Sequence, residues 1–172
     1  MLMGLHTYEI EKLHLATSIR SFRTPEVSSF VKSLLDTDKD NAKHLYLNIK
    51  NKYPIVITRD FGKAKEWIRH QCKGSTRYGL LASSGALRLK PEGIFVKNNI
   101  LVENWFLNDK DDVRSSYLLE DVATEFDIQG LELDYTLLAW DADFRFTNNT
   151  WTYYIFRGTK WNKINSKEKQ LY

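Results

Sequence analysis

The chain has 172 residues and a net charge of +3, and 42% of its residues are hydrophobic. This length predicts a single domain with a proper core. No apolar run approaches the roughly 18 residues that a membrane-spanning helix needs. The N-terminal residues lack the basic and apolar regions of a signal peptide, so we expect a cytoplasmic protein with no membrane partner. The mild positive charge permits nucleic-acid binding without requiring it.

The sequence gives little support to disulfide or metal chemistry. The single cysteine, Cys72, cannot form an internal disulfide, and we expect it to be a buried apolar residue near a helix end. No cysteine or histidine cluster has zinc spacing, so no metal ligand is predicted. The histidines are scattered and are expected on the surface or in the core: His6, His14, His44 and His70.

The N-terminal part of the chain predicts a strand followed by two helices. Residues 8–16 alternate well enough for a strand. A helix is expected after Thr24, because its hydroxyl can cap the helix and Pro25 suits the first helical position. Apolar residues then recur at helical spacing until about Asp36, and residues 39–51 predict a second, more polar helix.

The middle of the chain predicts two strands separated by a helix. Residues 53–60, YPIVITRD, have the apolar run of a buried strand, with a proline near its start. Asp60 can cap a helix over residues 61–72. Residues 78–83, YGLLAS, predict a further strand that leads into a short helix.

The segments further along are less regular. Residues 91–117 have the composition of a loop-rich insertion. Trp105 and Phe106 in this insertion could stack on bases, but we favour a core position for both. Asn148–Asn149 stand between alternating aromatic runs and predict a hairpin. The chain closes with the start of a basic helix at Ser166.

The most informative stretch covers residues 118–140, LLEDVATEFDIQGLELDYTLLAW. It predicts a strand, a glycine-containing turn and a second buried strand, with polar residues concentrated at the turn. Such turns are where α/β proteins keep their ligand contacts. A similar polar turn, Ser83-Ser84-Gly85, ends the strand at 78–83, and its backbone amides could hold a phosphate of ATP or of a nucleic acid.

Strands that alternate with helices predict an α/β fold. We expect one domain over residues 1–172, with a mostly parallel sheet of about five strands, helices on both faces and right-handed crossovers. The fold class alone does not specify a function, because unrelated activities share it.

The polar turn in the 118–140 stretch resembles motif V of superfamily 1 helicases and ATPases, roughly T-x-H-x-x-Q/K-G-x-E. The corresponding residues are Thr124, Phe126, Gln129, Gly130 and Glu132, with Phe126 where many relatives carry His. The resemblance implies that Glu132 lies near the ribose of a bound nucleotide and Thr124 near the nucleic-acid backbone. Gly130 would allow the backbone to approach the nucleotide closely.

The closest pattern is that of the Schlafen-like, phage-helicase-like branch, in which TEF-x-x-QGLELD is the usual form. Residues 79–89 match a second run of this branch, GLLASSGA-x-RL, and residues 114–116 match its RSS triplet. Through this resemblance, Ser83 and Ser84 become predicted nucleic-acid contacts.

Residues 15–27, LATSIRSFRTPEV, resemble motif IV of the same superfamily, roughly L-x-x-N-Y-R-S-x-x-x-I. In the family, the arginine of this motif reaches the γ-phosphate of ATP, and Arg20 is the matching position. A guanidinium suits this role because its donors match phosphate oxygens and it keeps its charge. Arg20 is therefore the expected catalytic and nucleotide-binding residue. The alternative is that Arg20 and Arg23 are surface arginines near a helix start.

These matches imply a RecA-like fold and, more narrowly, the second RecA-like domain of a nucleic-acid-dependent ATPase. A Walker A loop and Walker B carboxylates are absent from the sequence and belong to a first RecA-like domain. That N-terminal domain is the expected partner and would bind most of the ATP and Mg²⁺, while DNA or RNA is the expected strand. The chain also ends before a sequence like motif VI, so we expect no ATP hydrolysis from it alone.

Two other functions remain open. Glu132 and Asp134 could hold Mg²⁺ in a nuclease site, because paired carboxylates at strand ends can activate water. Further carboxylates lie nearby in the sequence, at Glu120, Asp141 and Asp143, but no lysine follows Asp134 at the spacing of the common nuclease core. Alternatively, the aromatic-rich segments 91–117 and 144–156 could form the interface of a protein-binding module without catalytic activity.

Overall fold

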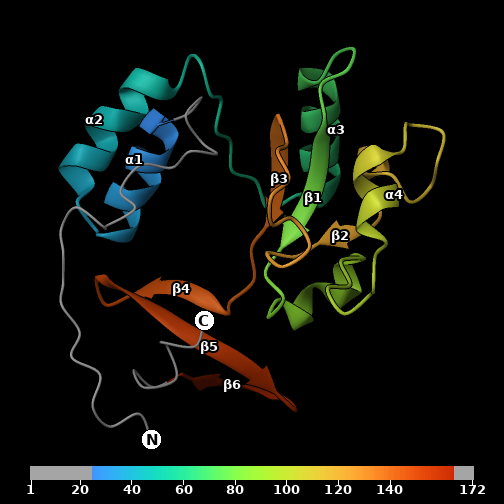
Figure 1. Cartoon of the computed structure of the whole chain (residues 1–172). Coiled ribbons are helices and arrows are strands. Elements are labelled where there is room, and N and C mark those ends of the chain that lie inside the picture. The colour runs from blue at the N-terminus through green and yellow to red at the C-terminus, as the bar shows by residue number, and fades with distance from the viewer. Residues whose placement is uncertain (1–24, 165–172) are drawn as a thin grey trace, which may run out of the picture. The chain divides into compact units, whose positions relative to one another are not determined.

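A computed structural model describes residues 25–164 of the chain (Figure 1). The chain divides into two compact units, residues 1–54 and residues 55–172, and each is described by itself. The predicted strand at 8–16, Arg20, Arg23 and the helix start at Ser166 lie outside the described residues.

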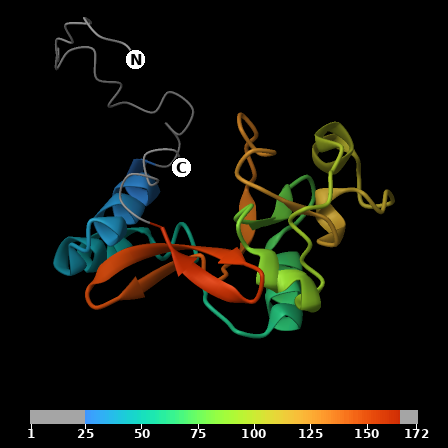
Figure 2. The same ribbon diagram turned by 90° about the horizontal axis from the view of Figure 1, so that it is seen from below.

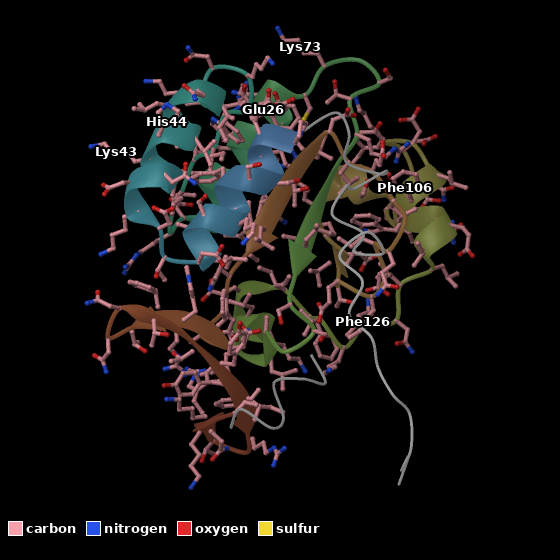
Figure 3. The ribbon with its side chains drawn as sticks, turned by 60° about the vertical axis from the view of Figure 1, so that its left-hand side comes forward. Glu26, Lys43, His44, Lys73, Phe106 and Phe126 are labelled. Atoms are coloured by element: carbon pink, nitrogen blue, oxygen red, sulfur yellow. The ribbon has the colours of Figure 1, made fainter. Side chains whose placement is uncertain are left out.

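The first unit contains a pair of helices, as predicted. Helix α1 spans Pro25–Leu35 and helix α2 spans Lys39–Ile49. Their contact includes the rings of Phe30 and Tyr46, whose centroids lie 5.9 Å apart. It also includes a 2.8 Å hydrogen bond from the Asn41 side chain to the Ser33 hydroxyl. Figure 3 labels Lys43 and His44 on α2, and both side chains are exposed.

The strand predicted at residues 53–60 is wrong, because this segment forms no strand in the structure. Its apolar side chains are open to solvent, and Ile57 is 95% exposed. A strand requires hydrogen bonds to a neighbouring strand, and the described part of the chain provides no such ladder here. The prediction of a helix after it is confirmed: α3 spans Phe61–Gln71, and the carboxylate of Asp60 accepts the Lys63 amide at 3.0 Å.

The second unit is built around a three-stranded parallel sheet in the order β2-β1-β3. Its strands are β1, Tyr78–Ala82; β2, Val122–Ala123; and β3, Tyr135–Ala139. In the register, Leu80 lies opposite Val122 and Leu137, and Leu81 lies opposite Ala123 and Leu138. Every residue of β1 is buried, whereas β3 alternates between half-buried and exposed side chains.

Apolar side chains cover both faces of β1. On one face, Leu80 packs with Ile68 of α3 and with Tyr117. On the other face, Leu81 packs with Trp105, which is 0% exposed. The indole N–H of Trp105 donates to the Asp121 carbonyl at 3.1 Å. The preference for a core position of Trp105 is therefore confirmed.

The segment predicted as a loop-rich insertion contains short helices as well as loops. A 3₁₀ helix, η2, spans Leu87–Glu92 and enters the segment, and α4 spans Val102–Leu107. A second 3₁₀ helix, η3, spans Ser116–Leu118. Phe106 of α4 is half-buried and lies 5.3 Å from the Arg77 guanidinium (Figure 3).

A second sheet is antiparallel, with three strands in the order β4-β5-β6 (Figure 2). The strands are β4, Phe144–Thr147; β5, Thr150–Arg157; and β6, Lys160–Lys163. The predicted hairpin is confirmed, because Asn148 and Asn149 join β4 to β5 with φ values of 51° and 59°. Asparagine tolerates this left-handed backbone better than most residues, which explains the turn. We call this sheet the meander.

The α/β class is confirmed, and the extent of the parallel sheet differs from the prediction. The parallel sheet has three strands rather than about five, because residues 53–60 stay unpaired and the last strands are antiparallel. Helix α3 covers one face of β1, and α4 supplies Trp105 to the other. Among residues 25–164, no helix is both long and apolar enough to cross a membrane.

The contact between Gly79 and Trp105 allows the packing of β1 against α4 to be tested by mutation. A methyl group at Gly79 would lie 2.6 Å from two carbons of the Trp105 ring. We expect Gly79→Ala to lower the free energy of unfolding by about 1–3 kcal/mol because it overpacks this face. Trp105→Phe should also destabilise the protein, because it removes ring volume and the bond to Asp121.

Trp105→Phe removes the atoms that clash with the new methyl group. The free energy of unfolding should therefore fall by less in the double variant than the sum of its decreases in the two single variants. Urea denaturation of all four proteins gives this coupling energy. Strictly additive losses would contradict the packing described for β1 and α4.

Candidate functional site

The carboxyl ends of the three parallel strands bring together residues that are far apart in the sequence. Because the strands run in the same direction, the segments that follow β1, β2 and β3 leave the sheet at one edge. These segments begin with Ser83–Ser84, Thr124–Glu125 and Trp140–Asp141. The structure therefore places the predicted residues Ser83, Ser84 and Thr124 at one edge of the sheet.

Ser84 and Glu125 are joined by two hydrogen bonds across this edge. The backbone N–H of Ser84 donates to Glu125 Oε2 at 2.9 Å, and the Ser84 hydroxyl donates to Oε1 at 2.7 Å. The next two amides are also paired: Gly85 donates to the Ser83 hydroxyl at 3.1 Å and Ala86 to the Ser83 carbonyl at 2.9 Å. The Glu125 carboxylate thus occupies the donors that were predicted to hold a phosphate.

Thr124 is held by the turn that it begins. Its N–H and its hydroxyl both donate to Asp127 Oδ2, at 2.8 and 2.6 Å. The Thr124 carbonyl accepts the amides of Asp127 and Ile128 at 3.1 and 3.3 Å. Thr124 is only 7% exposed, whereas Phe126, which Figure 3 labels, is 62% exposed. A ligand would reach the turn after Thr124 more easily than the Thr124 hydroxyl.

Acidic residues after β3 complete this edge. The Asp141 carboxylate accepts the Arg88 amide at 3.1 Å and the Ala142 amide at 2.6 Å. The carboxylate of Asp143 lies beside the Ser83–Gly85 turn, 3.2 Å from where a methyl group on Gly85 would stand. A carboxylate therefore accepts hydrogen bonds from, or lies beside, each of the three turns that follow β1, β2 and β3.

The remaining motif V residues lie along the return from β2 to β3. Gly130 has a φ of 88°, a backbone conformation that glycine adopts without strain. Glu132 is exposed. Asp134 lies at the opposite edge of the sheet, where its carboxylate accepts the Arg77 amide at 2.8 Å. Nearby, burial raises the pKa of the Cys72 thiol, and the negative charge of Asp134 raises it further.

The carboxylates of the nuclease hypothesis do not form one cluster. Asp134 precedes β3 and Asp141 follows it, so the strand separates them. Glu120 lies 3.1 Å from Lys65 in a salt bridge. No group of three or more histidine, cysteine or acidic side chains in the part of the chain described here could hold a metal ion.

The sequence patterns missed two residues at the edge, Glu125 and Asp127, and named Asp141 only as a possible carboxylate of a nuclease. The spacing of Thr124 and Asp127 is that of a local capping contact, so this bond had a sequence signal. No local pattern connects Glu125 with Ser84, because 41 residues separate them. Arg20, the predicted phosphate contact, lies outside the described residues, so its role stays a prediction.

Comparison with known families identifies the family of the chain. The model of the family described as Schlafen group 3, DNA/RNA helicase domain, matches residues 2–171. The chain belongs to this family. No curated protein and no solved structure matches the chain. Membership in the Schlafen group 3 helicase family indicates a helicase-related function that involves nucleic acid, and it confirms the Schlafen-like resemblance of the sequence.

The Thr124–Asp127 contact in this Schlafen-type turn can be tested by mutation. Asp127→Ala removes the acceptor of two Thr124 donors and leaves a nearly buried hydroxyl unpaired. We expect the free energy of unfolding to fall by about 1–3 kcal/mol. Asp127→Asn keeps a carbonyl oxygen at this position and should cost less. Urea denaturation measures both, and equal losses would contradict the assigned bonds.

Proposed function

We propose that this chain is the second RecA-like domain of a nucleic-acid-dependent ATPase or helicase. In this role, the edge formed by Ser83, Ser84 and Thr124 contacts the backbone of a DNA or RNA strand. Arg20, Gly130 and Glu132 contribute to the nucleotide site. A first RecA-like domain, with Walker A and Walker B sequences, holds most of the ATP and its Mg²⁺.

The observation that most supports this function is the meeting of the two Schlafen-type sequence runs at one edge. The turn after β1 and the turn after β2 are bonded to each other through Ser84 and Glu125. Ligands of parallel α/β sheets bind outside the carboxyl ends of the strands. The match to a DNA/RNA helicase family over residues 2–171 makes a nucleic-acid strand the fitting ligand.

The Glu125 carboxylate imitates a bound phosphate in this arrangement. Two of its oxygens accept the Ser84 amide and hydroxyl, which are the types of donor that turns offer to phosphate oxygens. A phosphate of the strand would replace the carboxylate at these donors. Glu125 therefore acts as an internal competitor, and it keeps the amides paired when no strand is bound.

The nucleotide site requires both RecA-like domains. Phosphoryl transfer needs a phosphate cradle, a lysine, Mg²⁺ ligands and arginines that neutralise developing charge. The sequence of this chain supplies an arginine by its motif IV resemblance, and the first domain supplies the cradle, the lysine and the metal ligands. Gly130, with its positive φ, keeps the turn free of a side chain where the nucleotide would approach.

This division of roles predicts the outcome of an ATPase assay. We expect no turnover from the purified chain alone. We expect strand-stimulated turnover when the chain is joined to a first RecA-like domain with Walker A and B sequences from the same family. In the joined protein, Arg20→Ala should lower kcat by roughly 100-fold or more, because an arginine on the γ-phosphate contributes at least this much.

Arg23→Ala is the matched control, because it removes the same charge from the same segment and should leave kcat within about twofold. Equal decreases of kcat in Arg20→Ala and Arg23→Ala would show that the effect comes from the positive charge of this segment and not from a specific contact of Arg20. Turnover by the chain alone would overturn the division of roles between the two domains.

Removal of the Glu125 carboxylate, the internal competitor, should strengthen binding of the nucleic-acid strand. Glu125→Ala frees the Ser84 donors for phosphate and removes one negative charge from the edge. We expect the Kd for a 20-nucleotide strand to fall by roughly threefold to tenfold, since bonds to charged groups contribute about 1.5–3 kcal/mol and part of this is offset by loop ordering. Fluorescence anisotropy with labelled oligonucleotides measures the change.

Glu66→Ala is the control for charge alone. Glu66 is exposed on α3, and its replacement changes the net charge by the same amount as Glu125→Ala does. The Kd should fall less for Glu66→Ala than for Glu125→Ala. A Glu125→Ala variant that is folded and binds no more tightly than Glu66→Ala would show that Ser84 does not bind phosphate.

A further inference from the structure

The meander has one face that is covered by aromatic rings. Cross-strand pairing places Phe144 opposite Tyr153 and Phe146 opposite Trp151, so these rings share a face. Their centroids lie 4.9 and 5.1 Å apart. Trp140, which directly follows β3, extends this group. We call these five residues the aromatic face: Trp140, Phe144, Phe146, Trp151 and Tyr153.

Three of these rings form a cluster in which each ring contacts the other two, and the centroids of Trp140 and Trp151 lie 6.2 Å apart. Phe144 and Trp151 are nearly parallel, with a centroid distance of 4.6 Å and an interplanar angle of 14°. Trp140 stacks on Phe144 at 5.6 Å and 27°. The indole N–H of Trp140 donates to the Phe144 carbonyl at 2.7 Å and so fixes its ring in this cluster. The cluster is therefore preorganised, and little side-chain entropy remains to be lost on binding.

The opposite face of the meander is the packed one. Thr152 is 5% exposed and is bonded to Thr147 through its hydroxyl. Arg145 lies 3.8 Å from the Tyr154 ring and 5.2 Å from the Trp161 ring. By contrast, rings of the aromatic face are exposed: Trp140 is 54% exposed, Phe146 is 42% exposed and Tyr153 is 41% exposed.

The charges of the meander are all positive. Residues 144–164 contain Arg145, Arg157, Lys160 and Lys163 and no acidic residue. The alternation of β5 places Arg157 on the same side as Trp151 and Tyr153, and Lys160 is paired with Arg157. Arg145 and Lys163 are paired with Thr152 and Tyr154 and so lie on the opposite face. Exposed rings on the same side of a sheet as cations suit single-stranded nucleic acid, because bases stack on rings and phosphates pair with cations.

From this geometry we propose that the aromatic face is a stacking surface for the bases of single-stranded DNA or RNA. Trp140 begins the surface at the carboxyl end of β3, next to Asp141, so the rings continue from the edge that contains Ser84 and Thr124. Bases stack on Trp140, Phe146 and Tyr153, and Arg157 and Lys160 pair with phosphates. This assignment rests on the proposed function for its choice of nucleic acid as the ligand.

Anisotropy of labelled 20-nucleotide oligo-dT and oligo-U with the purified chain tests the proposal. Trp140→Ala, Phe146→Ala and Tyr153→Ala should each raise the Kd by roughly fivefold or more, because each base–ring stack contributes about 1–3 kcal/mol. Trp140→Phe keeps a ring and should restore most of the affinity. Phe95→Ala removes a comparably exposed ring, 45% exposed, from outside the meander and should leave the Kd unchanged.

An oligonucleotide without bases distinguishes base stacking from electrostatic attraction between phosphates and cations. An abasic strand of the same length keeps every phosphate, and we expect it to bind the chain much more weakly than oligo-dT does. Its binding should respond little to Trp140→Ala. In addition, oligo-dT should quench the tryptophan fluorescence of the wild-type chain, and Trp140→Phe should reduce this quenching.

Several results would overturn the stacking surface. They are an unchanged Kd in all three folded alanine variants, equal affinity for the abasic strand, or no binding of either oligonucleotide at low salt. A chain that self-associates through Trp140, shown by a smaller size of Trp140→Ala in gel filtration, would assign the face to protein contacts instead. In each case, turnover of the joined two-domain protein and its loss in Arg20→Ala would still decide the proposed function separately.

Discussion

Burial of β1 on both faces is the constraint on which the second unit depends. Leu80 packs toward α3, and Leu81 packs toward Trp105. Gly79 provides the space that the Trp105 ring fills. Because β1 also pairs with a strand on each side, its position aligns the ends of β2 and β3. The polar turns of the candidate site therefore meet at one edge as a consequence of core packing.

The polar groups at this edge are paired within the protein. Glu125 accepts from Ser84, Asp127 accepts from Thr124, and Asp141 accepts from Arg88. Unpaired amides and hydroxyls in such partly buried turns would be costly, so internal carboxylates stabilise the unliganded edge. Binding of a phosphate then exchanges one anion for another, and the free energy gained is smaller than the new bonds alone would suggest.

The edge and the meander offer complementary chemistry to a nucleic-acid strand. Amide and hydroxyl donors around Ser84 suit phosphates, and the exposed rings of the aromatic face suit bases. Trp140 connects the two regions, because it directly follows β3 of the parallel sheet and belongs to the cluster of rings. A strand that follows this path would be held by its backbone and its bases at once, without hydrogen bonds that select a particular sequence.

Local patterns in the sequence predicted α1, α2, α3, the hairpin and the family. Asp60 predicted the start of α3, and Asn148–Asn149 predicted the turn of the meander, because caps and turns depend on neighbouring residues. Tertiary structure alone decided which segments pair as strands and which distant residues meet at the site. Residues 53–60 have the composition of a strand and no pairing partner in the described structure, and Glu125 meets Ser84 across 41 residues. Pairing and packing between distant segments are not encoded in any single stretch of sequence.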